Sequence, residues 1–252
     1  MPLSIQDWHN RFQIQAQWTK ALRLYFFGLL KNERIEKILD IGCGTGVLIP
    51  DLQSLTPAEI YGADLKLDRL NLAKDNCPET TLLGADVHQL PFRDSSFDMI
   101  LCHYFLLWVG NPGTALQEMR RVTKAGGYIV AFAEPDYGGR IDFPTDFYKI
   151  RDYQISGLLN AGADPKMGRK LKSLFTRGGF SAVVSGVYEG SWQDKQTQED
   201  IDSEWMVLEE DLSGLLNEKE LKALKKHDLV SRENGSRLIY VPTFYAWGVV
   251  EK

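Results

Sequence analysis

The sequence is poor in the residues that build disulfide scaffolds and metal centres. Its 252 residues include only three cysteines, Cys43, Cys77 and Cys102, and no two of them form a CxxC pair. An odd, scattered set of cysteines argues against a disulfide framework and against a structural zinc site. The four histidines are also dispersed and lack carboxylate pairs. We therefore expect no metal site.

Long apolar runs and a strong excess of one charge are missing as well. No apolar stretch approaches the roughly 20 residues that span a bilayer. The first twelve residues include Asp7, His9 and Arg11, where a secretory signal would be apolar. A total of 29 Lys and Arg against 34 Asp and Glu gives a net charge of −5, which does not favour a broad nucleic-acid or membrane surface. We expect a soluble, cytoplasmic protein without nucleic-acid or membrane partners.

What is present is an ordinary globular composition, with 44% hydrophobic and 25% charged residues, in which strands and helices alternate. Short apolar runs predict strands over 35–41, 59–63, 80–83, 97–102, 128–133, 180–188 and 243–250. Helical spacing predicts helices over 8–30, 47–55 and 67–74, from 112 to the Gly126-Gly127 pair, and from 167 to Gly178. Such alternation predicts right-handed crossovers and a parallel sheet that is covered on both faces.

Two segments break this alternation. Residues 136–165 are rich in Gly, Pro, Asp and aromatics, which predicts irregular or partly helical structure. Residues 190–237 form a second, helical insert, in which Trp205 belongs to an apolar stripe. We therefore divide the chain into four parts, which are an N-terminal helical cap over 1–34, a core over 35–189 with the first insert, the helical lid insert, and a final core strand over 238–252.

The glycine cluster Asp40-Ile41-Gly42-Cys43-Gly44-Thr45-Gly46 lies where a predicted strand ends and a helix begins. Glycine permits positive φ and removes the Cβ that would block a ligand, and a helix N-terminus offers free N–H groups. The dinucleotide pattern GxGxxG fails because Val47 occupies the third glycine position, and the GK[ST] of a triphosphate loop is absent. The turn is therefore expected to bind a different ligand.

This cluster resembles the first motif of the class I S-adenosylmethionine-dependent methyltransferases. The resemblance continues in the expected order through Gly62-Ala63-Asp64 and Gly84-Ala85-Asp86-Val87, and Leu90-Pro91-Phe92 is similar to the small-molecule (methyltransferase type 11-like) branch. It covers residues 35–134 strongly. The resemblance implies a Rossmann-like α/β fold, with a seven-stranded, mostly parallel sheet whose last strand is antiparallel and with helices on both faces.

The same resemblance implies the cofactor S-adenosyl-L-methionine, the product S-adenosyl-L-homocysteine and a set of contact residues. Asp64 is implied at the ribose, since a carboxylate can accept two hydrogen bonds from a vicinal diol. The glycine-loop amides suit the methionine carboxylate, and Asp40 can help to hold the ammonium indirectly. The cofactor-binding residues expected in this way are Asp40, Gly42, Cys43, Gly44, Gly46, Asp64, Leu65, Asp86, Val87 and Cys102.

Methyl transfer is an in-line displacement at carbon, and alignment can supply about 7–11 kcal/mol of its rate. The candidate catalytic residues are His103 and Tyr104, which follow the fourth strand. His103 is the best base by its intrinsic pKa, and the alternative is a packed histidine beside the cofactor. His9 can reach the pocket if the N-terminal helix caps it, but a solvent-facing position is the stronger expectation.

The aromatic residues in the added segments predict a lid over an apolar or aromatic small molecule, with plain packing as the alternative. Members of this set are Trp18, Tyr137, Phe147, Trp192 and Trp205. We expect a methyltransferase that acts on an O, N or C nucleophile of a small molecule. Two alternatives stay open, an RNA or protein methyltransferase and a non-catalytic S-adenosylmethionine-binding protein. The sequence does not indicate the acceptor or the oligomeric state.

Overall fold

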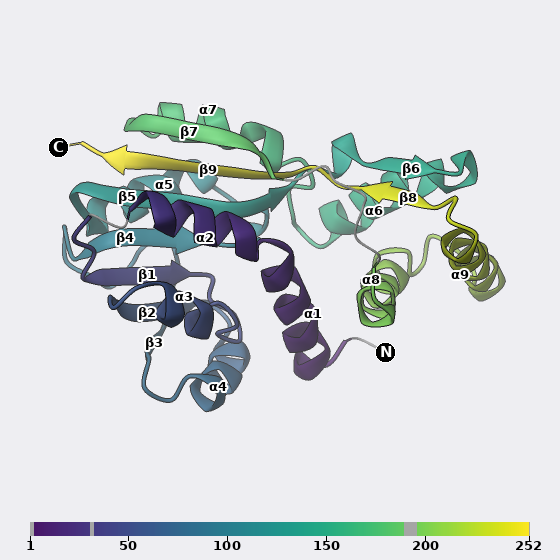
Figure 1. The fold of residues 1–252 in the computed structure, drawn as a ribbon, viewed down its shortest axis with the longest axis horizontal. Helices are drawn as coiled ribbons and strands as arrows, with labels where there is room; N and C mark the ends of the chain where they lie inside the picture. The colour runs from purple at the N-terminus through teal and green to yellow at the C-terminus, as the bar shows by residue number, and fades with distance from the viewer. Residues whose placement is uncertain (1–2, 31–32, 189–195, 252) are drawn as a thin grey trace.

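A seven-stranded sheet forms the centre of the computed structural model, which describes residues 3–30, 33–188 and 196–251. Its strands are β1 Lys37–Ile41, β2 Glu59–Asp64, β3 Thr81–Gly84, β4 Phe97–Cys102, β5 Thr123–Pro135, β7 Phe180–Tyr188 and β9 Thr243–Val250. Their order is β3-β2-β1-β4-β5-β9-β7. Strand β9 runs antiparallel to β5 and β7, whereas β3, β2, β1, β4 and β5 run parallel (Figure 1). The predicted Rossmann-like sheet with an antiparallel last strand is confirmed.

Helices cover both faces of this sheet, since successive side chains of a strand point to opposite sides. On β1, Ile38 belongs to one apolar core and Leu39 to the other, and both are fully buried. The core around Ile38 is closed by α2 (Lys20–Leu29) and α3 (Ile49–Leu55), and the core around Leu39 by α5 (Pro112–Val122) and α7 (Leu171–Arg177). Helix α4 (Leu67–Asn76) connects β2 to β3. The parallel strands are therefore buried on both faces, as their continuous apolar sequences predicted.

The order of the strands places a crevice at the carboxyl end of β1. The chain runs from β1 to β2 on one side of it and later returns to β4 on its other side. In open α/β sheets, ligands bind outside the carboxyl ends of the strands at this switch point. The carboxyl ends of β1, β4 and β5 point toward the side of Figure 1 where α1 (Ile5–Trp18) lies.

The two predicted inserts form one additional unit beyond the same edge (Figure 1). Strand β6 (Ile141–Phe143) pairs with β8 (Leu238–Tyr240), and three helices pack beside them, α6 (Tyr148–Asn160), α8 (Gln198–Asp211) and α9 (Glu218–Glu233). This unit has its own core, which includes Phe147 and Trp205. The indole of Trp205 donates a 2.8 Å hydrogen bond to buried Asp228. Trp205 and Phe147 therefore pack the insert, and the predicted insert residues 190–195, including Trp192, lie outside the described residues.

The N-terminal prediction of one helix over 8–30 is wrong. The chain forms α1 and α2, separated at Thr19, and α1 begins with a capping box between Ser4 and Asp7. The break turns α2, so that Phe26 is buried against Phe132 and Trp247, while Tyr25 is 58% exposed. Leu22 is buried as well, whereas Leu29 is exposed, so the break decides which side chains of α2 face the core.

Two other predicted boundaries differ from the structure more than the rest. The helix that begins at Pro112 ends at Val122 rather than at the glycine pair, and β5 already begins at Thr123. Gly127 lies within this strand, where a Cβ would come within 2.6 Å of the Asp98 carbonyl oxygen. The final core strand was predicted within 238–252. It begins only at Thr243, as β9, because residues 238–240 form β8 of the two-stranded sheet.

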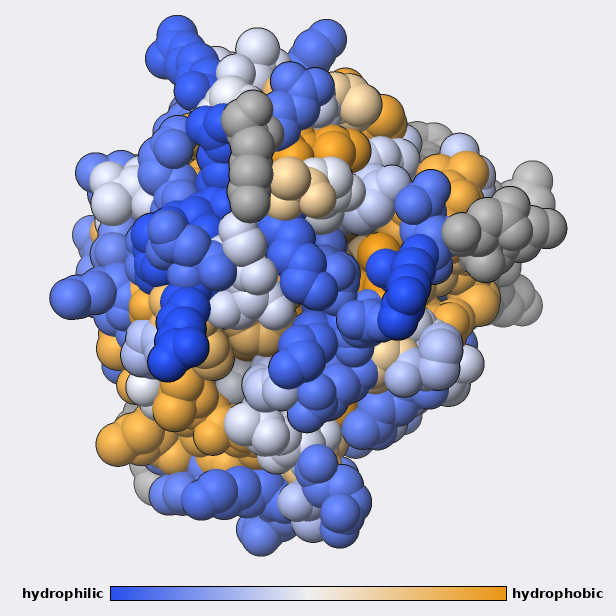
Figure 2. All heavy atoms as spheres, turned by 90° about the vertical axis from the view of Figure 1, so that its left-hand side faces the viewer, coloured by the Kyte–Doolittle hydropathy of each residue, from blue (hydrophilic) through white to orange (hydrophobic). Residues whose placement is uncertain are grey.

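The opposite edge of the sheet, where the parallel strands begin, faces the viewer in Figure 2. This face is mostly hydrophilic, with smaller apolar areas between the polar side chains. None of the helices in the described parts of the chain is both long and apolar enough to cross a membrane.

Candidate functional site

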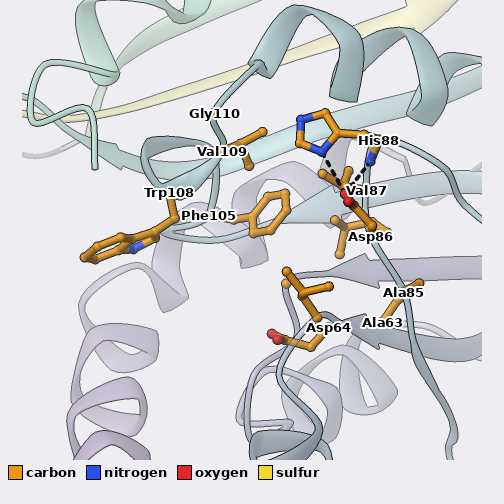
Figure 3. Close-up of a pocket in the computed structure, with 13 residues that line it drawn as sticks. Ala63, Asp64, Ala85, Asp86, Val87, His88, Phe105, Trp108, Val109 and Gly110 are labelled. Atoms are coloured by element: carbon orange, nitrogen blue, oxygen red, sulfur yellow. Dashed lines mark hydrogen bonds and ion pairs between the residues drawn. The ribbon is translucent and has the colours of Figure 1, made fainter. Parts of the chain in front are cut away.

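A cavity of about 280 Å³ lies at the carboxyl edge of the sheet (Figure 3). Segments that follow β1, β2, β3 and β4 contribute to its walls. The lining residues are Ile41, Gly42, Ala63, Asp64, Leu65, Ala85, Asp86, Val87, His88, Phe105, Trp108, Val109 and Gly110. Five of the residues predicted at a cofactor site, namely Gly42, Asp64, Leu65, Asp86 and Val87, therefore meet around one space.

The turn after β1 depends on glycine at Gly42. Its φ is +72°, and a Cβ there would overlap the Phe105 ring, whose Cε2 and Cγ would both lie 2.8 Å away. The amide of Gly42 donates to the Ala63 carbonyl at 2.7 Å, and the Cys43 amide donates to the same oxygen at 3.1 Å. Together with Gly44, whose amide donates to Asp64, these residues leave no free N–H at the start of the turn. That the glycine-loop amides hold the methionine carboxylate stays a prediction. The amides of Gly42, Cys43 and Gly44 already have acceptors within the protein, and what Gly42 contributes is the absence of a side chain.

Asp64 at the end of β2 joins this turn to the cavity. Only 7% of the residue is exposed. Its Oδ2 accepts a 2.8 Å hydrogen bond from the Gly44 amide and its Oδ1 accepts one of 2.8 Å from the Lys66 amide. An ionised carboxylate has about four lone-pair sites. Asp64 can therefore hold the turn in place and still accept hydrogen bonds from a ligand.

Asp86 and His88 form a polar pair on another wall. The Oδ1 of Asp86 accepts hydrogen bonds from the His88 amide at 2.9 Å and from its Nδ1 at 2.7 Å (Figure 3). These two hydrogen bonds lower the pKa of Asp86, so the carboxylate is ionised at neutral pH. No specific role was predicted for His88, which directly follows the motif Gly84-Ala85-Asp86-Val87 in the sequence.

The apolar walls come from the segment after β4, which sequence motifs did not identify. Phe105 points into the space between Val109 and Asp64, and the side chain of Trp108 is 48% exposed beside it (Figure 3). Glu134 from β5 fixes this segment, because its two carboxylate oxygens accept hydrogen bonds from three successive amides at 2.7–3.0 Å. Burial raises the pKa of Glu134 to about 7, and these hydrogen bonds oppose the rise.

Asp40 lies beneath the cavity, not in its lining. It is 1% exposed, and its Oδ2 has no hydrogen-bond partner among the described residues. Burial and the nearby charge of Asp64 raise the pKa of Asp40 to about 8, while Arg23 opposes the shift. A buried acid with an unpaired oxygen is costly for a folded protein. Asp40 is therefore suited to a cationic or hydrogen-bond-donating ligand group.

Four other predicted cofactor residues also fail to line the cavity. Cys43 and Cys102 are buried, and burial raises the pKa of both thiols. Gly46 is packed so that a Cβ would lie 3.3 Å from both Ala73 and Cys77. Gly44 is covered by the N-terminal helix. Cys43, Gly44 and Gly46 belong to the turn and Cys102 ends β4, but none of them lines the cavity. A motif match does not distinguish residues that support a site from residues that contact the ligand.

His103 and Tyr104 lie next to the cavity without lining it. The Nε2 of His103 is 2.7 Å from the Thr19 hydroxyl at the junction of α1 and α2. Burial, assisted by the charge of Arg23, lowers the pKa of His103 to about 3, so the ring is neutral. Tyr104 has φ +49°, an uncommon value for a residue with a Cβ. Within the described residues, no group of His, Cys, Asp and Glu side chains is arranged to hold a metal ion.

Helix α1 covers the glycine turn. His9 is 8% exposed, and its Nδ1 lies 2.9 Å from the Thr45 hydroxyl. Phe12 contacts Gly44, since its Cε2 lies 3.4 Å from the place of a Cβ. The expectation that His9 faces solvent is therefore wrong, because α1 folds back over the sheet edge. Burial lowers the pKa of His9.

Comparison with known proteins gives a consistent result. The family model described as a methyltransferase domain matches residues 39–131. A ubiquinone/menaquinone biosynthesis C-methyltransferase of Campylobacter jejuni is 35% identical, over 54% of this chain and 67% of that protein. An uncharacterized methyltransferase of Schizosaccharomyces pombe is 30% identical, over 56% of this chain and 55% of its own. The chain spans about half the length of the first curated relatives that it matches.

Solved structures share the fold at low sequence identity. Phosphoethanolamine N-methyltransferase 2 of Haemonchus contortus, in complex with S-adenosylhomocysteine, has a TM-score of 0.59 at 14% identity and covers 100% of this chain and 61% of its own. The [4+2]-cyclase SpnF has a TM-score of 0.56 at 16% identity and covers 90% of this chain and 81% of its own. A protein named for a cyclisation thus has this same fold, so the fold alone does not define the reaction.

Proposed function

The chain belongs to the class I S-adenosylmethionine-dependent methyltransferase superfamily, and we propose that it transfers the methyl group of that cofactor to a small-molecule acceptor. The observation that carries the proposal is the cavity in which Gly42, Asp64 and Asp86 meet from three different strand ends. When bound, the cofactor supplies a methyl group on a positively charged sulfur, which a nucleophile can attack in line. The residues around the cavity fit the separate parts of this molecule.

The nucleoside part would be held by Asp64 and by the wall that follows β3. Asp64 retains lone pairs after it accepts from the Gly44 and Lys66 amides, so it can also accept from two ribose hydroxyls. Val87 and Phe105 offer apolar surfaces to an aromatic base, and the ionised Asp86 offers an acceptor to an exocyclic amine. We assign the adenosine to this half of the site.

The methionine part would lie toward the glycine turn and α1. Asp40 carries the unpaired buried oxygen there, and a nearby ammonium group would favour its ionised form. The turn contributes close approach, because Gly42 has no Cβ between the backbone and the cavity. Its first amides are already bonded, so we do not assign the methionine carboxylate to them.

His103 is proposed as a positioning residue rather than a general base. It is neutral, and its hydrogen bond to Thr19 connects the end of β4 to the start of α2. A group with a pKa of about 3 is far from the neutral range in which proton transfer is efficient. Helix α1 covers the glycine turn and contacts α8 of the insert, which favours a fixed alignment of acceptor and methyl group.

A small-molecule acceptor is supported by the cover over this edge and by the relatives. Several curated relatives are named demethylmenaquinone methyltransferases or a ubiquinone/menaquinone C-methyltransferase. Helix α1 packs directly on the glycine turn, so a large macromolecular surface cannot approach the turn from this side. The net charge of −5 gives no attraction to RNA.

The test combines cofactor binding with product detection. The protein is incubated with a metabolite extract and methyl-labelled S-adenosylmethionine, and mass spectrometry identifies the compound that gains the label. Calorimetry should show that Asp64→Ala weakens cofactor binding at least tenfold, about 1.4 kcal/mol, because a charge-assisted diol contact is lost. The matched control is Asp68→Ala, since Asp68 is an exposed acid in the first turn of α4. Wild-type affinity in Asp64→Ala would refute the ribose assignment, and an extract that gains no label would refute the transfer.

A further inference from the structure

Arg11 on α1 is a buried cation without a carboxylate partner in the part of the chain that the structure describes. It is 7% exposed, and its Nη1 donates to the Ser203 hydroxyl of α8 at 3.2 Å. Its guanidinium also lies 4.7 Å from the centre of the Trp18 ring. Its Nε makes no hydrogen bond, and no Asp or Glu of the described residues lies within ion-pair distance. An unpaired buried charge is strongly unfavourable, so a missing partner requires an explanation.

The other two buried arginines of the described chain each form an ion pair with an aspartate. Arg23 is 1% exposed and pairs with Asp51 at 2.7 Å. Arg140 is 6% exposed and pairs with Asp142 at 2.7 Å. Burial of an arginine is therefore accompanied by a carboxylate at both of these positions, and Arg11 is the exception.

Arg11 lies near the glycine turn and near the segments that follow β4 and β5. The next residue, Phe12, contacts Gly44 of the glycine turn. Tyr104 follows β4 and Tyr137 follows β5. Burial raises the pKa of both hydroxyls, and the positive charge of Arg11 opposes this rise. Tyr104 directly precedes Phe105 in the cavity wall. Arg11 is thus positioned between the cofactor cavity and the insert.

The free edge of the guanidinium determines what kind of group it can bind. Nη1 is bonded to Ser203, and Nε is a buried donor with no hydrogen-bond partner among the described residues. Nη2 lies beside Nε on the same edge of the planar guanidinium, so this edge presents two parallel N–H donors. That pair of donors matches the two oxygens of one carboxylate. A single positive charge balances a monoanion. A phosphate dianion would leave an excess of negative charge in a buried site, particularly beside Asp211.

We propose, as an extension of the methyltransferase function, that Arg11 binds a carboxylate of the methyl acceptor and that the acceptor is therefore a small carboxylic acid. The expected apolar or aromatic acceptor then acquires one charged end. The anchor and the glycine-turn cover belong to the same helix, so the carboxylate is held at a fixed position relative to the cofactor. This arrangement orients the acceptor without contributing a proton-transfer group.

Asp211 at the end of α8 is the competing explanation. Burial raises its pKa to about 6, its hydrogen bond from Gln154 at 3.1 Å lowers it, and Arg11 and Arg140 lower it further. If Asp211 were the true partner of Arg11, its removal would leave Arg11 uncompensated and would destabilise the protein. If Arg11 binds an exogenous carboxylate, removal of this nearby acid should instead strengthen binding.

The test uses benzoate, its neutral analogue benzamide and phenyl phosphate as probes. Each is titrated by calorimetry into protein saturated with S-adenosylhomocysteine. We expect the wild type to bind benzoate at least tenfold more tightly than benzamide and more tightly than phenyl phosphate. Arg11→Met should abolish the preference for benzoate while the affinity for S-adenosylhomocysteine is unchanged. Arg177→Met, which removes an exposed arginine of α7, should leave the preference intact.

The outcomes separate this proposal from the methyltransferase function. Failure of the wild type to bind S-adenosylhomocysteine refutes the function itself. Normal binding of S-adenosylhomocysteine with no benzoate binding, or with equal benzoate and benzamide affinities, overturns the role of Arg11. Tighter binding of phenyl phosphate overturns the carboxylate assignment. If Arg11→Met does not fold, Asp211→Asn decides, since tighter benzoate binding supports the proposal and a lower melting temperature with unchanged benzoate binding overturns it.

Discussion

Substitution of Gly42 by alanine tests the geometry of the glycine turn most directly. Two separate costs are expected at this position. The backbone φ of +72° is unfavourable for any residue with a Cβ, and the new methyl group would overlap the ring of Phe105. The ring would have to move, and because Gly42 and Phe105 both line the cavity, this movement would change the cavity wall. Gly42→Ala should therefore reduce both stability and cofactor binding.

The magnitude follows from these two costs. A left-handed conformation costs a residue with a Cβ about 1–2 kcal/mol, partly offset by about 0.4–1 kcal/mol from the smaller entropy of the unfolded chain. Overpacking costs a further ~1–3 kcal/mol. Gly126 provides a matched control, because its φ is +77° and nothing lies within 4 Å of its Cβ position. Gly126→Ala should cost about 1 kcal/mol, and Gly42→Ala about 2–4 kcal/mol.

Urea unfolding and calorimetry with S-adenosylhomocysteine measure the two effects. The double variant Gly42→Ala/Phe105→Ala removes the overlap, so it should be more stable than the sum of the single changes by about 1–3 kcal/mol. Gly42→Ala should weaken binding at least tenfold, about 1.4 kcal/mol, whereas Gly126→Ala should not change it. Equal destabilisation by Gly42→Ala and Gly126→Ala, with no coupling to Phe105, would refute the close packing of this turn.

Two further predictions concern pH. The folded-state pKa of Asp40, about 8, exceeds its ordinary value of 3.8, so the free energy of unfolding that Asp40 contributes falls as pH rises from about 4 to about 8. Asp40→Asn should therefore gain stability relative to the wild type over this range in urea unfolding, and a constant difference would contradict the buried acid. The pKa of His103 is depressed from 6.5 to about 3, so stability is lost as pH falls through that range. Between pH 6.5 and about 3, His103→Gln should therefore lose less stability than the wild type. The pH–rate profile of this variant should equal that of the wild type. An inflection near pH 6.5 that only the wild type shows would instead identify His103 as a titrating base.

Local patterns predicted most of the central fold. The strands over 97–102, 180–188 and 243–250 agree with the structure in both bounds, because short runs rich in β-branched and aromatic residues between turn residues are typical of strands. The boundary at Gly126-Gly127 was misplaced. Glycine favours a helix end, but Gly127 is required by the approach of the Asp98 carbonyl to the strand. Propensity and tertiary packing select glycine for different reasons, and a single sequence does not distinguish them.

The cavity was predicted where one residue follows each strand in a recognisable motif, as for Asp64 and Asp86. Phe105 and His88 were not predicted as wall residues because neither belongs to a motif that the resemblance includes. Their roles depend on Glu134, which holds the amides after β4, and on the hydrogen bond from His88 to Asp86. Such contacts join residues through hydrogen bonds that sequence spacing does not encode.

The succession of strands and helices along the chain and the glycine turn were determined by the sequence itself, because apolar periodicity and the need for positive φ are local properties. Only the tertiary structure decided which face of the N-terminal segment is buried, since the break at Thr19 turns α2 against Phe132 and Trp247. It also decided that His9 and Arg11 are buried, because α1 lies between the glycine turn and α8. Burial of a polar side chain depends on which distant segments pack around it, and that information is absent from any short stretch of sequence.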